Sequence, residues 1–161
     1  MRMEAYGQSR LEIKNTSNIM MNENIASIMT REVVTVRPDD SMKEVHKLIF
    51  ERRFHHLPVT SDGKLVGIIT TWDLLKSNLK EEECDNYKVQ DWMTRKVATL
   101  GPHELVGAAA MIFLKHLFHA LPIVDEEGHL LGIVSTHDIL RYEYNREYPD
   151  DVFLRDTKWA E

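Results

Sequence analysis

The sequence predicts an α/β protein of the α+β type, made of two tandem β-α-β-β-α repeats with pseudo-twofold symmetry. Two observations carry this prediction. The chain aligns with itself over most of its length, and each copy ends in the same short pattern: residues 67–73, GIITTWD, return as residues 132–138, GIVSTHD. Each pattern has a buried apolar run followed by a helical leucine pattern, which indicates a strand that leads into a helix.

The internal repeat holds over most of the chain. Residue 30 aligns with residue 94, an offset of 64 residues, and one inserted residue in the turn after residue 62 changes the offset to 65. Self-similarity at such a period indicates a duplicated structural unit, and two units of about sixty residues are expected to pack on each other because each core is small. The identities under this alignment include Pro38 with Pro102, Phe54 with Phe118, His55 with His119, Gly67 with Gly132 and Asp73 with Asp138.

The first half of each unit is predicted as a strand and a helix. Residues 33–36, VVTV, are β-branched and short, which favours a strand that ends before Pro38. Ser41 and Glu44 have the spacing of a capping box, and the apolar spacing that follows predicts a helix that ends near Arg53.

The second half of each unit is predicted as a hairpin and a second helix. Two apolar runs, residues 57–60 and 65–69, flank an Asp-Gly pair, which is the strongest short signal for a two-residue hairpin turn. The helix that follows is expected over about residues 71–79. In the second copy, the helix over residues 105–114 is apolar or small on nearly every side, so we expect it to be buried between the repeats or in a dimer contact.

These signals divide the chain into five parts. The linker is charged and contains Cys84, a short helix is expected over residues 25–29, and the last helix is expected to continue through Tyr144 and to break at Pro149. The predicted parts are an N-terminal extension (1–24), repeat 1 (25–80), a linker (81–88), repeat 2 (89–146) and a C-terminal tail (147–161).

Composition limits the class of partner and the compartment. The net charge of −6 and the pI near 5.8 argue against nucleic acid as a main partner, because a phosphate backbone needs a basic face. The single cysteine excludes an internal disulfide and favours a reducing compartment. Neither a signal core nor an apolar run long enough to span a bilayer is present, so we expect a cytoplasmic protein without a membrane partner.

The duplicated hydroxyl and carboxylate are the main candidate site. Thr70 with Asp73, and Ser135 with Asp138, are three residues apart and therefore share a face of the first helical turn. A carboxylate there could accept two hydrogen bonds from a ribose diol. The same spacing is also an ordinary capping box that binds nothing. The duplication favours the ligand site, because it occurs twice in the same context.

Four further motifs resemble the tandem CBS-domain pair, or Bateman module. They are residues 28–30 (IMT) and 92–94 (WMT) at the starts of the repeats, and residues 56–59 (HLPV) and 120–123 (ALPI) before the hairpin turns. The resemblance covers about residues 25–144. It implies two repeats whose sheets face each other with two clefts between them, in a stand-alone, non-catalytic regulatory module that binds an adenosine nucleotide and acts on a partner protein, commonly as a homodimer.

The resemblance also implies which residues contact the ligand. The family's aspartate and hydroxyl correspond to Asp73 with Thr70 and to Asp138 with Ser135. Its adenine-binding strand and the segment before the proline point to four more positions: Thr35, Thr99, His56 and Ala120. The position after the motif hydroxyl, basic in some relatives, is Thr71 or Thr136 here. Cations for a phosphate would then come from Arg52, Arg53, His55, His56, His119 or His137, which favours AMP or ADP over ATP.

Three alternatives remain open at this point. A metal site could use His55 with His56, or His116 with His119, but no cysteine cluster or acidic ligand set accompanies them. The module could be an interaction scaffold without nucleotide, or could respond to S-adenosylmethionine. An enzyme is not expected, because the sequence has no nucleophile elbow, no phosphate-binding loop with lysine and no zinc-protease signature.

Overall fold

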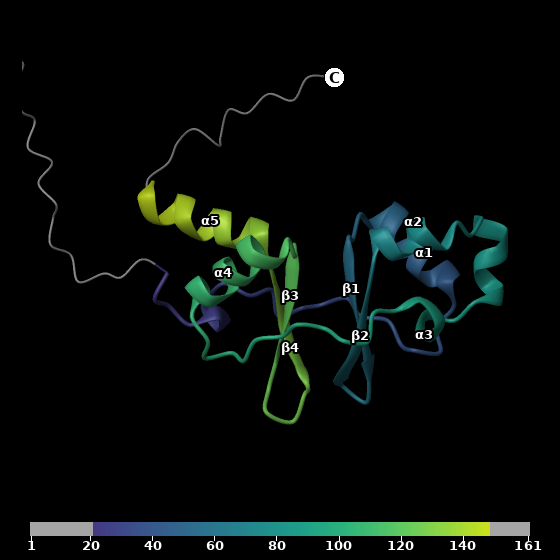
Figure 1. Cartoon of the computed structure of the whole chain (residues 1–161), viewed down its shortest axis with the longest axis horizontal. Coiled ribbons are helices and arrows are strands. Elements are labelled where there is room, and N and C mark those ends of the chain that lie inside the picture. Colours follow the sequence, from purple (N-terminus) through teal and green to yellow (C-terminus); the bar gives the residue numbers. More distant parts are fainter. Residues whose placement is uncertain (1–20, 149–161) are drawn as a thin grey trace, which may run out of the picture.

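The computed structural model describes residues 21–148, and it confirms the predicted fold class. Each repeat has a two-stranded antiparallel sheet: β1 (His56–Ser61) pairs with β2 (Lys64–Thr70), and β3 (Ala120–Val124) pairs with β4 (Leu130–Ser135). In Figure 1 the two hairpins face each other at the centre of the molecule, and the helices lie on the outer sides.

The helices follow the predicted order with small differences at their ends. The last helix ends at Glu147, and the predicted break at Pro149 lies outside the described residues. The helical elements are η1 (Ile25–Ser27), α1 (Met42–Arg52), α2 (Thr71–Ser77), η2 (Glu81–Asn86), α3 (Val89–Trp92), α4 (Val106–His116) and α5 (Thr136–Glu147).

The hairpin turn of repeat 1 has the predicted geometry. Asp62 and Gly63 lie between β1 and β2 with φ angles of 51° and 78°, and Ser61 pairs with Lys64 across the turn. Positive φ at both central residues defines the two-residue turn whose twist matches that of paired strands, and an Asp-Gly pair tolerates it. The turn places Thr70, the last residue of β2, opposite His56 at the start of β1.

The predicted strand at residues 33–36 is wrong. Only Val36 pairs with the hairpin, in a parallel bridge: its N–H donates to the Pro58 carbonyl at 3.1 Å, and its carbonyl accepts from the Thr60 N–H at 2.9 Å. Thr30, six residues earlier, is hydrogen-bonded to β4 of the other repeat. The segment between these two residues therefore crosses from one repeat to the other, and it cannot form a ladder with either hairpin.

The predicted capping box of Ser41 and Glu44 is also wrong, although α1 begins where expected. Ser41 is the N-cap residue, but its side chain makes no capping hydrogen bond. Instead, the Met42 N–H donates to the Tyr87 carbonyl at 2.9 Å, and Lys43 forms an ion pair with Asp85 at 2.6 Å. The Glu44 N–H, which a capping box would bond to the Ser41 hydroxyl, donates to the Ser41 carbonyl at 3.1 Å, and the Tyr87 carbonyl satisfies a different N–H of the first turn.

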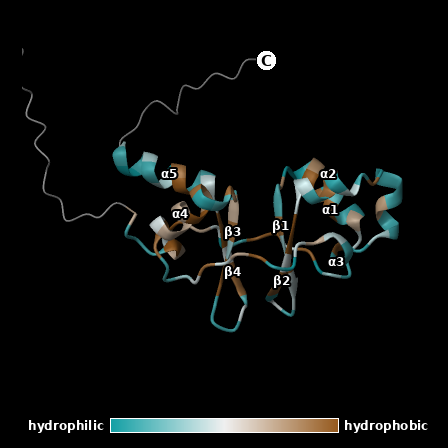
Figure 2. Ribbon diagram, in the orientation of Figure 1, coloured by the Kyte–Doolittle hydropathy of each residue, from teal (hydrophilic) through white to brown (hydrophobic). Residues whose placement is uncertain are grey.

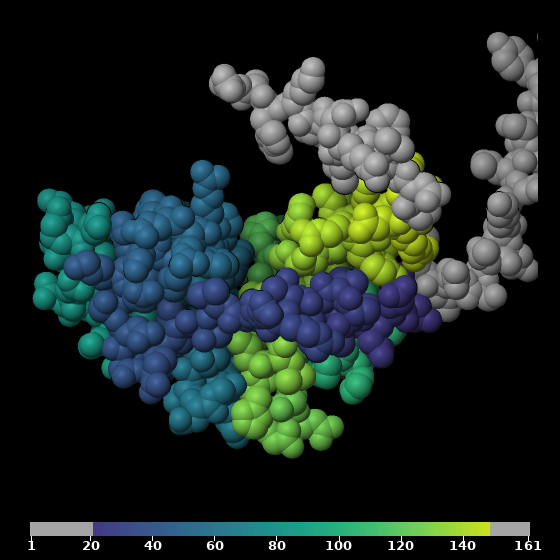
Figure 3. All heavy atoms as spheres, turned by 180° about the vertical axis from the view of Figure 1, so that it is seen from behind, coloured from purple at the N-terminus to yellow at the C-terminus, as the bar shows by residue number. Residues whose placement is uncertain are grey.

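The first residues of each repeat are hydrogen-bonded to the hairpin of the other repeat. The Thr30 and Ile133 backbones exchange two hydrogen bonds of 2.9 Å, and Thr94 and Ile68 exchange bonds of 2.8 and 2.9 Å. Figure 3 shows the N-terminal segment, in purple and blue, running across repeat 2 and on to repeat 1. The two repeats therefore exchange their first segments, and they are joined by backbone hydrogen bonds as well as by packing.

The exchange explains the glycine at the start of each motif. A Cβ atom at Gly67 would lie 2.8 Å from the Met93 sulfur and 3.0 Å from the Thr94 carbonyl. One at Gly132 would lie 2.8 Å from both the Met29 sulfur and the Thr30 carbonyl. Only glycine allows the crossing segment to approach this closely.

Each repeat has its own hydrophobic core, completed by residues from the exchanged segments. Cys84 of the linker and Met93 at the start of repeat 2 are buried in the core of repeat 1, while Ile25 and Met29 at the start of repeat 1 are buried in the core of repeat 2. Residues 81–88, interpreted above as a charged linker, therefore contribute Cys84 to a core. Figure 2 shows hydrophobic residues along the strands of both repeats and hydrophilic residues at the turn between β3 and β4.

Helix α4 is not buried between the repeats, so that part of the prediction is wrong. Val106, Ala109 and Phe113 face the core, but Leu114 is 82% exposed and Met111 is 50% exposed. Its apolar outer face has no cover within the described chain. Burial in a dimer contact, the other alternative, stays a prediction.

Candidate functional site

A cavity of about 910 Å³ lies between the two repeats and brings most of the predicted site residues together. Its volume falls in the range of small-molecule sites. The starts of β1 and β3 and the strand-to-helix junctions β2–α2 and β4–α5 all contribute to its wall. Six of the nine predicted ligand-binding residues line it: His56, Thr70, Asp73, Ala120, Ser135 and His137.

The Thr70 and Asp73 pair is both a capping box and part of the cavity wall. Asp73 Oδ2 accepts hydrogen bonds from the Thr70 N–H at 2.9 Å and from the Thr70 hydroxyl at 2.6 Å, while the Asp73 N–H donates to Thr70 Oγ1 at 3.3 Å. Both of these carboxylate bonds fall on Oδ2. Within residues 21–148, Oδ1 has no hydrogen-bond partner and is available to a ligand.

The Ser135 and Asp138 pair repeats the same cap with a different outcome. Asp138 Oδ2 accepts from the Ser135 N–H at 2.8 Å and from its hydroxyl at 2.6 Å. The second carboxylate oxygen lies 3.9 Å from the Arg141 guanidinium, and the side chain is only 13% exposed. Asp138 is absent from the lining of the cavity, whereas Ser135 is present. The two carboxylates are therefore not equivalent.

Thr35 and Thr99 lie elsewhere. Thr35 is exposed and outside the cavity, and Thr99 lines a smaller cavity of about 210 Å³ beside Arg95. In the large cavity the corresponding part of the wall is formed by the earlier residues Thr94, Val97 and Ala98.

The cavity is lined by basic side chains, of which sequence reasoning found only some. His55, His56, His119 and His137 line it as expected, but Arg52 and Arg53 do not. Two lysines that the sequence interpretation missed, Lys76 and Lys96, are on the wall. Lys76 follows Asp73 by one helical turn, a spacing that could have indicated it. No local sequence pattern indicated Lys96, because it reaches the cavity only through the crossing of the chain between the repeats.

Two of these side chains have defined neighbours. The Lys76 ammonium lies 5.4 Å from the centroid of the Trp72 ring, within range of a cation–π interaction. The His55 Nδ1 atom lies 3.3 Å from the Thr71 hydroxyl. Burial lowers the pKa of His56, and repulsion from His119 and His55 lowers it further, while Asp73 opposes the shift. These effects favour the neutral form of His56.

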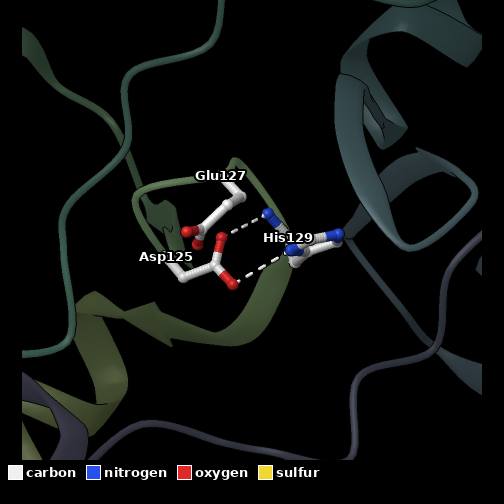
Figure 4. A group of neighbouring side chains, drawn as sticks. All are labelled: Asp125, Glu127 and His129. Atoms are coloured by element: carbon white, nitrogen blue, oxygen red, sulfur yellow. Dashed lines mark hydrogen bonds and ion pairs between the residues drawn. The ribbon is translucent and has the colours of Figure 1, made fainter.

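A separate acidic group lies in the β3–β4 turn (Figure 4). Among residues 21–148, Asp125, Glu127 and His129 alone form a set of three metal-type side chains with ligand atoms within 4.8 Å of each other. The Asp125 carboxylate accepts from the His129 N–H at 2.7 Å and lies 3.0 Å from its ring Nδ1. Burial raises the pKa of Asp125, but these hydrogen bonds outweigh it and the net shift is downward. These contacts between Asp125 and His129 close the β3–β4 turn, and this closure explains why the three side chains lie close together.

Two facing repeats, with a cavity between them and the same capped strand-to-helix junction in each, are the architecture of a CBS pair. The model of the family named "CBS domain" matches residues 25–80 and 89–145, together more than half of the chain. The chain belongs to the CBS-domain family, as a tandem pair, and CBS pairs are in general regulatory and not catalytic.

Solved structures of CBS-domain proteins have the same fold. The chain shares 32% identity and a TM-score of 0.71 with protein MJ1225 from Methanocaldococcus jannaschii, covering 78% of this chain and 49% of that one. It shares 27% identity and a TM-score of 0.69 with CBSX2 in complex with AMP. With the CBS pair of protein MJ0100, in complex with 5′-methylthioadenosine and S-adenosyl-L-methionine, the values are 29% and 0.67. The last two alignments each cover 78% of this chain and 98% of the other.

Curated relatives include enzymes, but only part of each is matched. A homoserine O-acetyltransferase from Methanococcoides burtonii is 39% identical over 125 residues, which is 77% of this chain and 25% of the relative. The chain thus spans about a quarter of that relative, and the similarity says nothing about an acetyltransferase activity here. Across residues 21–148, none of the helices has the length and apolar character needed to cross a bilayer.

Proposed function

We propose that this CBS pair binds an adenosine nucleotide in the cavity between its repeats and transmits the binding to a partner protein. The observation that carries the proposal is the Asp73 carboxylate on the cavity wall, with one oxygen held by Thr70 and the other without a partner in the described chain. A ribose offers two adjacent hydroxyl donors, and an ionised carboxylate is their strongest acceptor.

The proposed ligand is AMP or ADP rather than ATP. The AMP complex of CBSX2 shows that a similar fold accepts this ligand. The threonines after the motif hydroxyls, Thr71 and Thr136, supply no cation, so phosphate charge must be balanced by the more distant basic side chains of the wall.

Asp73 is proposed as the working carboxylate, with Thr70, His56, Ala120, Ser135 and His137 as further ligand contacts. Asp138, Thr35 and Thr99 lie outside the cavity and are proposed as contacts only for a second ligand in the family's other cleft. A single ligand is therefore the expected stoichiometry, in contrast to the two clefts that the resemblance implies.

Signalling requires that the ligand prefer one of two states of the protein or of its assembly. Exposed apolar side chains occupy equivalent positions on the outer helices of both repeats: Phe50 and Leu75 in repeat 1, Leu114 and Leu140 in repeat 2, each at least 60% exposed. We propose that these faces meet in a homodimer, whose arrangement would change when the cavity fills. Buried, unpaired Cys84 is consistent with a reducing cytoplasmic environment.

The test is isothermal titration calorimetry with AMP on the wild-type protein and on Asp73→Asn and Asp138→Asn. Asparagine keeps a capping oxygen but loses the charge that the diol needs, so both variants should fold. We expect Asp73→Asn to weaken AMP binding about tenfold or more, since hydrogen bonds to a charged group contribute about 1.5–3 kcal/mol. Asp138→Asn is the matched control and should bind normally. Equal losses in both variants would contradict the assignment of Asp73, and no AMP binding at all would contradict the function.

A further inference from the structure

The charge of the cavity is opposite to that of the chain. The whole chain has a net charge of −6, yet the lining contains two lysines, four histidines and a single carboxylate, Asp73. That carboxylate is already hydrogen-bonded to Thr70. A basic concave surface on an acidic protein concentrates anions locally.

The two lysines approach the cavity from different parts of the fold. Lys76 lies on α2 of repeat 1, over the Trp72 ring. Lys96 lies in residues 94–100, the second segment that crosses between the repeats. Thr94 is hydrogen-bonded to β2, and Leu100 is hydrogen-bonded to β3. The segment that carries Lys96 is thus hydrogen-bonded to both repeats, and Lys96 lines the same cavity as Lys76.

The pseudo-symmetric positions have a different charge arrangement. Under the repeat alignment, Lys96 corresponds to Glu32, and Lys76 corresponds to Arg141. Arg141 lies 3.9 Å from Asp138, and neither Glu32 nor Arg141 lines the large cavity. The duplication therefore does not account for the lysine pair. It belongs to one copy of the site.

We propose that this cavity takes its ligand as an anion held between Lys76 and Lys96, and that the surrounding histidines bind protons as the anion enters. The inference rests on the proposed function and adds which side chains hold the phosphate and where the balancing protons go. It predicts selection of a phosphorylated adenosine, such as AMP, over uncharged adenosine and over cationic S-adenosylmethionine.

The proton uptake follows from the groups that face the cavity. Burial and the neighbouring His119 and His55 lower the pKa of His56. A phosphate dianion favours the charged imidazolium and raises the pKa of each histidine near it. The titratable and charged groups on the wall are His55 and His56 of the β1 region, Asp73 and Lys76 of α2, Lys96 of the crossing segment, His119 before β3 and His137 of α5.

The first experiment compares AMP with adenosine by calorimetry on the full chain. We expect AMP to bind at least about tenfold more tightly than adenosine, in line with the strength of charge-assisted hydrogen bonds. Lys96→Glu, which installs the residue of the other repeat, and Lys76→Ala should each remove most of that difference and leave adenosine binding unchanged. Arg141→Ala is the matched control and should keep the wild-type ratio.

The second experiment measures protons. At pH 7.4 a phosphate monoester is mostly dianionic, because its second pKa is about 6, so protons taken up on AMP binding go to the protein. Titrations in HEPES and in Tris, which differ in ionisation enthalpy, should show net uptake with AMP and none with adenosine. His119→Gln should reduce the uptake, and His103→Gln, outside the cavity, should not.

The outcomes separate this inference from the function on which it rests. An unchanged ratio of AMP to adenosine affinity in Lys76→Ala and Lys96→Glu, with Asp73→Asn still weakening both ligands, overturns the anion site and leaves the adenosine site standing. Zero proton uptake with AMP overturns the histidine part. Failure of both ligands to bind overturns the function and the inference together.

Discussion

The two repeats have the same cap at the same place but not the same site. In both, a hydroxyl residue ends a strand, and the aspartate three residues later accepts hydrogen bonds from its N–H and hydroxyl, with distances that differ by at most 0.1 Å. Asp73 lies on the wall of the large cavity, while Asp138 lies beside Arg141 and off that wall. The motif therefore fixes the local turn, and its neighbours decide whether the carboxylate can meet a ligand.

The exchanged segments, in contrast, are symmetric and should be equally important in both repeats. Met29 and Met93 are each 8% exposed, each in the core of the repeat whose hairpin the segment joins. Met29→Ala and Met93→Ala should each lower the free energy of unfolding by about 3 kcal/mol, the usual cost of a large-to-small core substitution. Urea denaturation measures this. A much smaller loss in Met29→Ala would mean that the N-terminal segment contributes little to repeat 2.

Gly67 and Gly132 lie on the other side of the contacts made by Met93 and Met29, so substitutions there test the same symmetry. Gly67→Ala and Gly132→Ala should each cost about 2 kcal/mol, because the added methyl meets a carbonyl that cannot move freely as well as a flexible methionine. Gly101→Ala is the control, since nothing lies within 4 Å of its Cβ position. Thermal and urea unfolding would show the difference. A stable Gly67→Ala protein would contradict the close approach.

The caps separate stability from binding. Thr70→Ala and Ser135→Ala should each destabilise the protein by about 1 kcal/mol, because each removes one side-chain cap of a helix. The two variants should be alike in urea titration, whereas in AMP titration Thr70→Ala should lose more affinity, because it also removes the hydroxyl that orients Asp73. Equal losses of AMP affinity would contradict Asp73 as the working carboxylate.

The smallest expected effect is a pH dependence from His56. Its pKa in the folded protein lies below the unfolded value of about 6.5, so the unfolded state binds more protons between these two values. The contribution of His56 to the free energy of unfolding is fully present above pH 6.5 and is lost as the pH falls through the folded pKa. His56→Gln should flatten the change in melting temperature between pH 7.5 and 5.5, and His103→Gln should leave it unchanged. An identical slope in wild type and His56→Gln would contradict the burial effect.

Much of this protein follows from sequence because the signals are local. The Asp-Gly turn needs positive φ at two adjacent residues, and a hydroxyl with an acid three positions on satisfies free helix N–H groups, so both were predicted and both are present. Internal identity at fixed offsets indicated two units with one fold. Six of the predicted ligand-binding residues lie on one cavity, because the two strand-to-helix junctions and the paired starts of β1 and β3 meet there.

Only the tertiary structure decided the rest, because the remaining features depend on contacts between residues far apart in the chain. The crossing of residues 30–36 between repeats removed a predicted strand, and at α1 the Tyr87 carbonyl accepts from the Met42 N–H while the predicted Ser41 side-chain cap is absent. Cys84, in a run of charges, became a core residue through the packing of η2 on α1. A second crossing, of residues 94–100, carries Lys96 to the cavity, where no spacing or propensity in the sequence would place it.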